Sequence, residues 1–181
     1  GIGVVAPNGI GREEFGEAII EGRSGVGYIE SFDTTGIPIK IAGEVRDFDV
    51  LPYLGEHRKN AKLMGRAARF AIGAAAMAVE DSGIRTRDLD PARIGVTMGT
   101  GITPVDVNEL VPPILRGLGE DGEFDLAKFA QARSESIFPL WLLQHLPNMA
   151  AAHISILHQA MGPNNTIVTA CAAGTQAVGE A

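Results

Sequence analysis

The sequence predicts an α/β fold with a largely parallel sheet that is covered by helices. Short runs of apolar and β-branched residues at 2–6, 93–101 and 165–170 are typical of buried strands. Two longer segments, 62–82 and 149–161, place apolar residues at three- and four-residue spacing, as amphipathic helices do. Strands that alternate with helices along the chain favour parallel pairing. The helix between two strands brings the chain back to the end of the sheet where the first strand began, so the next strand runs in the same direction.

The first half of the chain carries a local signal for each expected element. The triplet at 7–9, Pro-Asn-Gly, closes the first apolar run and predicts a turn. Acidic residues near its start support a helix over 12–22, and residues 31–55 predict short surface strands and turns. The helix at 62–82 is rich in alanine, which implies close packing on both sides, and Gly83 is placed to end it.

The second half of the chain predicts a strand, then a charged helical insertion, and then helix and strand in alternation again. The strand at 93–101 runs into glycines. The charged segment that follows, 106–136, predicts a helical insertion with helices at 107–118 and 126–132. The helix at 149–161 then leads to the last strand, after which the final residues predict the start of another helix.

Composition and charge narrow the class of function. The net charge of −7 and the pI of about 5.1 disfavour nucleic acid as the main partner, because phosphate binding requires a basic surface. A single cysteine allows no internal disulfide and fits a reducing cytoplasm. No apolar run approaches the roughly 18–20 residues that span a bilayer. No linker divides the chain, so we expect one domain, residues 1–181, in the cytoplasm. Because the chain lacks an initiator Met, we expect it to begin inside a longer protein.

Cys171 is the strongest candidate for a chemically reactive residue. It follows the apolar run at 165–170, so it lies where a strand passes into a helix. The positive end of a helix dipole favours a thiolate, and unpaired first-turn N–H groups can face a developing oxyanion. Small side chains at Ala172, Ala173 and Gly174 let a substrate approach the backbone. A small, buried and inert thiol is an equally good interpretation of these residues alone.

A family resemblance surrounds Cys171 and extends along the chain. The active-site segment of the β-ketoacyl-(acyl carrier protein) synthases, condensing enzymes of the thiolase superfamily, resembles TACAAGTQAVGEA and the preceding GPN. Further family segments resemble, in the same order, GIGVVAPNGIG, GRSGV, FDTTGIP, AAMAVEDSGI, RIGVTMGTGI and LPNMAAAHISI. The likeness is strong for the synthase II-like group and is shared by type II polyketide ketosynthases. It implies a layered αβαβα thiolase-like fold, with residues 1–181 as its N-terminal half, truncated at both ends.

The resemblance implies an acyltransferase that performs decarboxylative Claisen condensation. Cys171 would take an acyl chain, as a thioester, from the phosphopantetheine of an acyl carrier protein. Malonyl-carrier protein would lose carbon dioxide, and its carbanion would attack that thioester, while the Cys171 N–H would form half of the oxyanion hole. The family's catalytic histidines, its lysine and the second oxyanion donor belong to its C-terminal half. We therefore expect these 181 residues alone to be inactive in condensation.

The histidines of this chain match none of those catalytic positions. They are His57, His145, His153 and His158. His153 lies on a predicted amphipathic helix, where a packed side chain is expected. Its five-residue separation from His158 is unsuited to ligating one ion from a helix, so no metal is expected. We also expect no tightly bound cofactor, since phosphopantetheine would arrive with the carrier protein.

Three further positions would contact the substrate if the resemblance holds. Ile102 matches a residue that lines the acyl pocket and limits chain length, although a core isoleucine after a strand is an equal alternative. Ala170, beside the nucleophile, belongs with the substrate-binding residues. Trp141 matches a usually aromatic position that reaches the partner subunit's pocket, and ordinary interface packing is the alternative. Its bulk would give a shorter or differently shaped acyl pocket.

A basic cluster stands out in the otherwise acidic chain. It consists of Arg58, Lys59, Lys62 and Arg66. The corresponding segment of the family docks the acidic carrier protein, and a solvated helix face is an equally good alternative. Family synthases usually carry Asp where Gly65 stands, so the geometry beside the cluster departs from the family pattern.

The resemblance also implies an assembly and leaves rival functions open. Residues 166–170 correspond to the strand that pairs across the family's twofold axis, so a homodimer is expected, or a heterodimer with a chain-length partner in a polyketide system. The rivals are a coenzyme A-dependent thiolase, a non-condensing acyl-binding module and a plain α/β domain with an inert thiol. The residues GPNNTIVTACAAG resemble the condensing synthases more closely than the thiolases.

Overall fold

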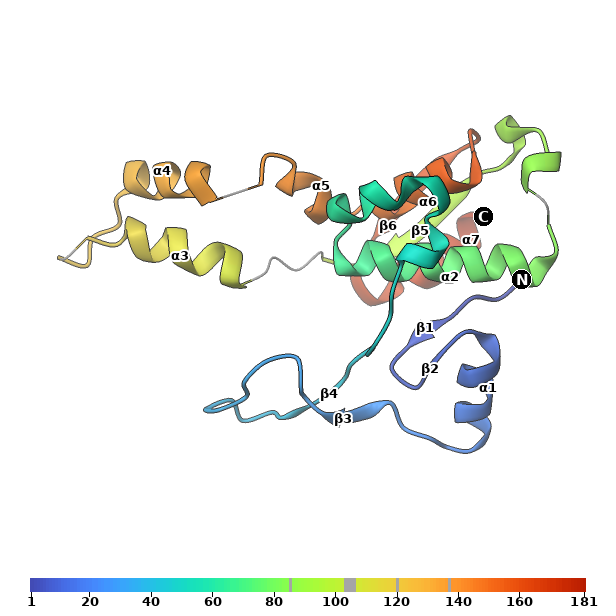
Figure 1. The fold of residues 1–181 in the computed structure, drawn as a ribbon, viewed down its shortest axis with the longest axis horizontal. Helices are drawn as coiled ribbons and strands as arrows, with labels where there is room; N and C mark the ends of the chain where they lie inside the picture. The colour runs from blue at the N-terminus through green and yellow to red at the C-terminus, as the bar shows by residue number, and fades with distance from the viewer. Residues whose placement is uncertain (85, 103–106, 120, 137) are drawn as a thin grey trace.

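The computed structural model describes residues 1–84, 86–102, 107–119, 121–136 and 138–181. Figure 1 shows a body of helices and strands from which two segments project, a helical hairpin and an arm that contains two short strands. Within these described ranges, no helix is both long enough and apolar enough to cross a bilayer.

The body is built around one parallel pair of strands. β5, Val96–Thr100, pairs with β6, Asn164–Val168, from Val96 opposite Asn164 to Thr100 opposite Val168. The helices α6, Met149–His158, and α7, Ala173–Glu180, both pack against this pair. The expected strand–helix alternation is therefore confirmed in the part of the chain that leads to Cys171.

A hydrophobic cluster of buried residues joins the long helix α2, Arg66–Ser82, to α6. The short 3₁₀ helices η1, Leu51–Tyr53, and η2, Gly55–Leu63, lie before α2 and border the same cluster. Small side chains on both helices allow close approach, and Gly83 ends α2 with a φ of 68°, as expected. The buried members of the cluster are Val50, Leu54, Met64, Ala68, Ile72, Ala150 and Ile154.

The N-terminal segment differs from the expected parallel sheet. β1, Val5–Ala6, and β2, Gly9–Ile10, are antiparallel, because the two residues between them form a tight turn and a parallel pair needs a longer crossover. α1, Arg12–Ile20, follows. A second antiparallel pair, β3, Val26–Tyr28, with β4, Ile41–Gly43, forms the projecting arm. Among the described strands, β5 and β6 are the one parallel pair.

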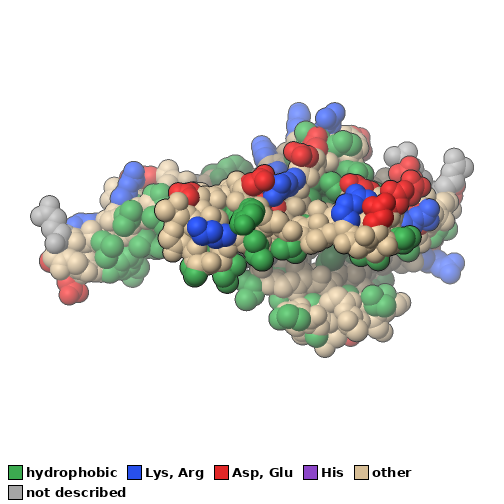
Figure 2. All heavy atoms as spheres, turned by 90° about the horizontal axis from the view of Figure 1, so that it is seen from below, with side chains coloured by type: hydrophobic (Ala, Val, Ile, Leu, Met, Phe, Trp, Pro, Cys, Tyr) green, Lys and Arg blue, Asp and Glu red, His purple; other side chains and the backbone are tan. Residues whose placement is uncertain are grey.

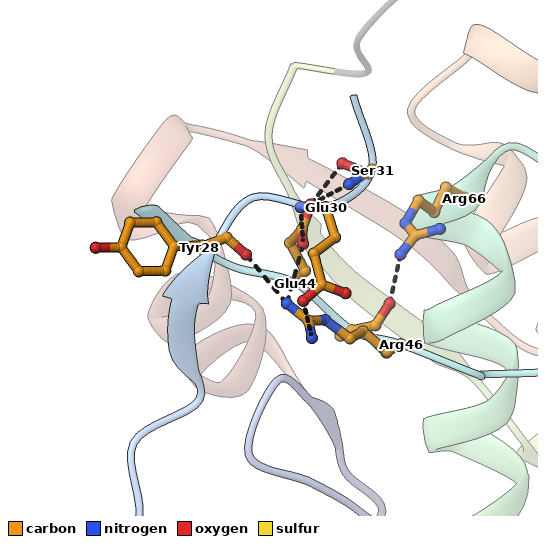
Figure 3. A network of polar contacts seen from close by, with 7 residues as sticks. Tyr28, Glu30, Ser31, Glu44, Arg46 and Arg66 are labelled. Atoms are coloured by element: carbon orange, nitrogen blue, oxygen red, sulfur yellow. Dashed lines mark hydrogen bonds and ion pairs between the residues drawn. The ribbon is translucent and has the colours of Figure 1, made fainter. Parts of the chain in front are cut away.

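Polar contacts hold this arm together, and one of them joins it to the body (Figure 3). The Glu44 carboxylate accepts hydrogen bonds from the Ser31 hydroxyl at 2.5 Å and from the backbone N–H groups of Glu30 at 2.9 Å and Ser31 at 3.2 Å. The Ser31 hydroxyl, followed by the Glu30 N–H, lowers the pKa of Glu44 from its usual 4.5 to about 2. Arg66, the first residue of α2, donates to the Val45 carbonyl at 2.6 Å.

The charged excursion forms the predicted helical hairpin. α3, Val107–Gly117, and α4, Leu126–Ser136, pack against each other and project from the body (Figure 1). α5, Trp141–His145, returns the chain to the body. Figure 2 shows hydrophobic side chains at the surface of the hairpin. The exposed ones include Val107, Val111, Ile114, Leu115, Leu118, Phe124 and Leu126.

The remaining short helices connect these parts. η3, Thr86–Asp88, and η4, Pro91–Arg93, lie between α2 and β5. η5, Ala170–Ala172, lies between β6 and α7 and contains the cysteine.

Candidate functional site

Cys171 lies exposed on the sharp turn between β6 and α7. Its neighbour Ala170 has a φ of 49°, in the left-handed region, where a residue with a Cβ carries a strain of about 1–2 kcal/mol. A strained turn of this kind lifts the following side chain away from the sheet. The interpretation of Cys171 as a buried thiol is therefore wrong for this chain.

Contacts on either side of the turn hold it against the sheet. Ala173, the first residue of α7, is 2% exposed and lies so close to Gly99 of β5 that a methyl group at Gly99 would overlap its backbone. The hydroxyl of Thr169, before the turn, lies 2.5 Å from the side-chain oxygen of Gln176 on α7. β5 therefore contacts the residue that follows the turn in α7, and α7 contacts the residue that precedes the turn.

The first turn of α7 faces Cys171 with the positive end of the helix dipole. The N-cap residue, Ala172, offers no side-chain acceptor, so no cap of its own competes for the first N–H groups. Such a helix start favours a thiolate and can stabilise an oxyanion that develops next to it. The geometry therefore suits the attack of a thiolate on a carbonyl carbon.

Ile102 reaches the same edge of the sheet as Cys171. Thr100 and Val168 are paired at the carboxyl ends of β5 and β6, and Ile102 and Cys171 follow them by two and three residues. The Ile102 side chain is 92% exposed, so its interpretation as a core isoleucine is wrong for this chain. The loop at 103–106 lies outside the described residues, and the role of Ile102 in an acyl pocket stays a prediction.

The basic cluster lies at the surface but not on one helix. Arg58, Lys59 and Lys62 lie on η2 and Arg66 opens α2, whereas the sequence predicts a helix that begins at 62. The extended backbone at Met64 and Gly65 separates the two segments, because Met64 is buried in the core cluster. All four basic side chains are exposed. Their role in docking stays a prediction, because basic side chains that contact only water would be exposed in the same way.

Helix α5 packs directly beside this basic segment. The Gln144 amide donates to the Lys62 carbonyl at 2.6 Å, and a Cβ at Gly65 would lie 2.5 Å from the Gln144 carbonyl oxygen. The close approach of α5 therefore leaves no room for a side chain at position 65. A hollow of about 340 Å³ opens at the same place. Its lining includes Gly65, Phe70, Thr100, Gln144 and Met149.

Trp141, at the start of α5, is partly buried between α5 and the hairpin. Its indole N–H donates to the Glu109 carboxylate at 2.6 Å, and the Arg133 guanidinium lies 4.4 Å from the centre of its ring. The indole also stacks on His145 at a centroid distance of 4.1 Å. Its entry into a partner subunit's pocket stays a prediction.

Two histidines are packed, as the sequence predicts for His153. His153 is 4% exposed on α6, and burial lowers its pKa below the usual 6.5. Burial lowers the pKa of His158 in the same way. The Nε2 atoms of both are buried and lack a hydrogen-bond partner among the described residues. These properties fit neutral, packed histidines.

Sequence reasoning missed several residues that support the site. Thr169 and Gln176 lie on either side of the cysteine. A hydroxyl and an amide side chain so close in sequence could have indicated the hydrogen bond between them. Gly99 stood in the strand that runs into glycines, where close backbone approach is a common reason for Gly. Glu109 and Arg133 carried no such signal, because Trp141 is distant from Glu109 in sequence.

The chain is similar to known proteins over its whole length. Residues 1–181 match the family described as "Beta-ketoacyl synthase, N-terminal domain". A 3-oxoacyl-(acyl-carrier-protein) synthase 2 of Synechocystis sp. is 35% identical over 181 residues, which are 100% of this chain and 40% of that protein. The corresponding synthase of Vibrio harveyi is 32% identical over the same shares of the two chains.

The likeness extends to solved structures. The ishigamide ketosynthase/chain length factor aligns with a TM-score of 0.76 and 30% identity over 99% of this chain and 41% of that one. The expected thiolase-like α/β fold, in its N-terminal part, is thereby confirmed. The chain spans about 40% of the length of the curated relatives it matches. It belongs to the β-ketoacyl synthase family, of which it carries the N-terminal domain.

Proposed function

We propose that the protein containing this chain is a condensing acyltransferase of fatty acid or polyketide elongation, with Cys171 as its nucleophile. The observation that carries the proposal is the exposed Cys171 on a strained turn at the start of α7. A thiolate at this place can attack an acyl thioester, form a new thioester bond to Sγ and release the phosphopantetheine thiol of an acyl carrier protein.

The second half of the proposed reaction forms the carbon–carbon bond. Malonyl-carrier protein loses carbon dioxide, and the electron pair left on its methylene carbon attacks the carbonyl carbon of the Cys171 thioester. The thioester bond then breaks, and Sγ leaves as the thiolate. In this proposal the N–H of Cys171 donates to the carbonyl oxygen as negative charge develops on it. Under this proposal the histidines of this chain take no part, since His153 and His158 are packed, His145 stacks on Trp141, and His57 lies beside Glu56 on η2.

The proposal includes carrier-protein docking at the basic cluster and a twofold assembly. Exposed Arg58, Lys59, Lys62 and Arg66 suit an acidic partner and would steer its approach. Among the described strands β6 pairs with β5 alone, so its other edge is open to the matching strand of a second subunit or of a chain-length partner. We propose a cytoplasmic location because the substrates, carrier-bound thioesters, are expected there.

Acylation of Cys171 tests the function. The full-length protein is incubated with an acyl-carrier protein, and the mass of the peptide that contains Cys171 is measured. We expect that peptide to gain one acyl group, which the Cys171→Ala variant does not, and product to form only after malonyl-carrier protein is added. Acylation by coenzyme A thioesters alone would favour a thiolase, and acylation without condensation would favour an acyl-binding module. An unmodified Cys171 with both kinds of donor would contradict the proposal.

A further inference from the structure

One polar contact spans the turn that carries Cys171. The hydroxyl of Thr169, two residues before the cysteine, donates to the side-chain oxygen of Gln176, five residues after it, at 2.5 Å. β6 and α7 lie side by side in the body (Figure 1), and this contact links the residue that follows β6 to α7. The contact therefore closes a loop of the chain that contains the whole turn.

The backbone of this loop is strained and needs restraint from outside. Ala170 has a φ of 49°, and a strained residue of this kind persists only where its surroundings hold it. After the turn, the backbone of Ala173 is held by its close approach to Gly99 of β5. Before the turn, the Thr169 carbonyl accepts from the Ala172 N–H at 3.2 Å, a bond that stays within the turn itself. The Thr169 hydroxyl therefore adds a link from that side of the turn to a separate element.

The packing of α7 restrains its rotation about the helix axis only weakly. Its buried residues are Ala173 and Ala177, which lie one turn apart on a single stripe of the helix. Alanine side chains form low ridges, so such a stripe resists rotation of the helix less than large interdigitating side chains do. Gln176 lies beside this stripe, about 100° around the axis from Ala177, and its contact with Thr169 opposes the rotation.

Stability alone does not account for the contact. Thr169 and Gln176 are both exposed, where water competes for their polar groups and one hydrogen bond adds little to the free energy of folding. A rotation of α7 moves the cysteine directly, since Cys171 lies one residue before the N-cap of the helix. The contact therefore matters more for the direction of the thiol than for the fold.

We propose that Gln176 is a positioning residue for the acylation of Cys171. By accepting the Thr169 hydroxyl, it holds α7 in one rotation beside β6 and so fixes the direction in which the Cys171 thiol leaves the turn. The inference rests on the proposed function, in which Cys171 attacks the carbonyl carbon of a thioester. That attack requires the sulfur to be aligned with the carbonyl group, so its rate depends on the direction of the thiol.

The test measures acylation of Cys171 by an acyl-carrier protein in the full-length protein. Gln176→Leu removes the acceptor and Thr169→Val removes the donor. Each should lower the acylation rate at saturation about tenfold with little change in KM. The double variant should be no slower than either single variant, because both changes act through one bond. Thr169→Ser keeps the hydroxyl and should keep the parental rate. Thr175→Val is the matched control, because it makes the same change at an exposed residue of α7 that takes no part in the contact.

Two further measurements do not depend on acylation. Alkylation of the exposed Cys171 by iodoacetamide, a small reagent that can approach from any side, should keep its parental rate in every variant that retains the cysteine. Amide hydrogen exchange in the peptide that contains residues 169–176 reports on the turn itself. It should be faster in Gln176→Leu and Thr169→Val than in the parent, in Thr169→Ser and in Thr175→Val.

The outcomes separate this inference from the proposed function. If the parent Cys171 accepts no acyl group, the proposed function fails and the role of Gln176 in acylation fails with it, while hydrogen exchange still reports whether the contact holds the turn. A parental acylation rate in folded Gln176→Leu, additive losses in the double variant, or a parallel fall in alkylation would each overturn the positioning role. Unchanged hydrogen exchange would show that the contact does not restrain the turn. If Gln176→Leu fails to fold, Thr169→Val provides the same readouts.

Discussion

Replacing Gly99 by Ala should move the nucleophile. The added Cβ would lie 2.5 Å from the carbonyl carbon of Ala173 and 2.6 Å from the nitrogen of Gly174, both in the backbone of α7. Ordinary contact begins at 3.4 Å, so α7 must move away from β5 by about 1 Å. Backbone atoms cannot rotate aside as a flexible side chain would, and the helix must shift with the turn that carries Cys171.

The cost follows from that displacement. Overpacking of a well-packed site costs about 1–3 kcal/mol, and we expect a value near 3 kcal/mol because a backbone must move. A misplacement of about 1 Å lowers the rate of a positioned reaction by about 100-fold. The assays are the free energy of unfolding in urea and the rate of Cys171 acylation in the full-length protein.

The matched control is Gly16→Ala in α1. A Cβ there meets nothing within 4 Å, so the change should stabilise the helix by about 1 kcal/mol or less and leave acylation unaltered. Gly99→Ala with parental stability and a parental acylation rate would refute the reasoning that β5 positions the turn. A loss of stability with a parental rate would show that α7 can move without Cys171.

Three other perturbations test separate parts of the structure. Lys59→Glu with Lys62→Glu should raise the KM for the carrier protein and flatten its salt dependence, whereas Lys40→Glu, an exposed change on the arm, should do neither. Ala170→Gly should relieve the left-handed strain and raise the free energy of unfolding by up to about 1 kcal/mol, and a fall would contradict that strain. The pKa of Glu44 is lowered to about 2, so its carboxylate stabilises the fold above pH 4.5 and loses this effect as the pH falls towards 2. Unfolding in urea should therefore show Glu44→Gln less stable than the parent at pH 7 and the two converging at low pH, and a constant difference would exclude this role.

Much of the site could be predicted because its signals are local. The strand, the cysteine and the small residues after it are contiguous, and strand and helix periodicity depend on neighbouring residues. The two helices of the hairpin were predicted for the same reason, with boundaries that differ by a few residues from α3 and α4. The helix predicted from 62 was wrong at its start, because burial of Met64 in the core outweighs the local helical pattern.

By itself, then, the sequence determined the alternation of strands and helices, the place of Cys171 at a strand–helix junction and the resemblance to condensing synthases. Only the tertiary structure decided that Cys171 is exposed, that Gly99 lies against α7, and that Trp141 contacts Glu109 and Arg133. The physical reason is the range of the forces that act. Propensity and periodicity act over one or two turns, whereas burial, close backbone approach and side-chain pairing join residues that are far apart along the chain.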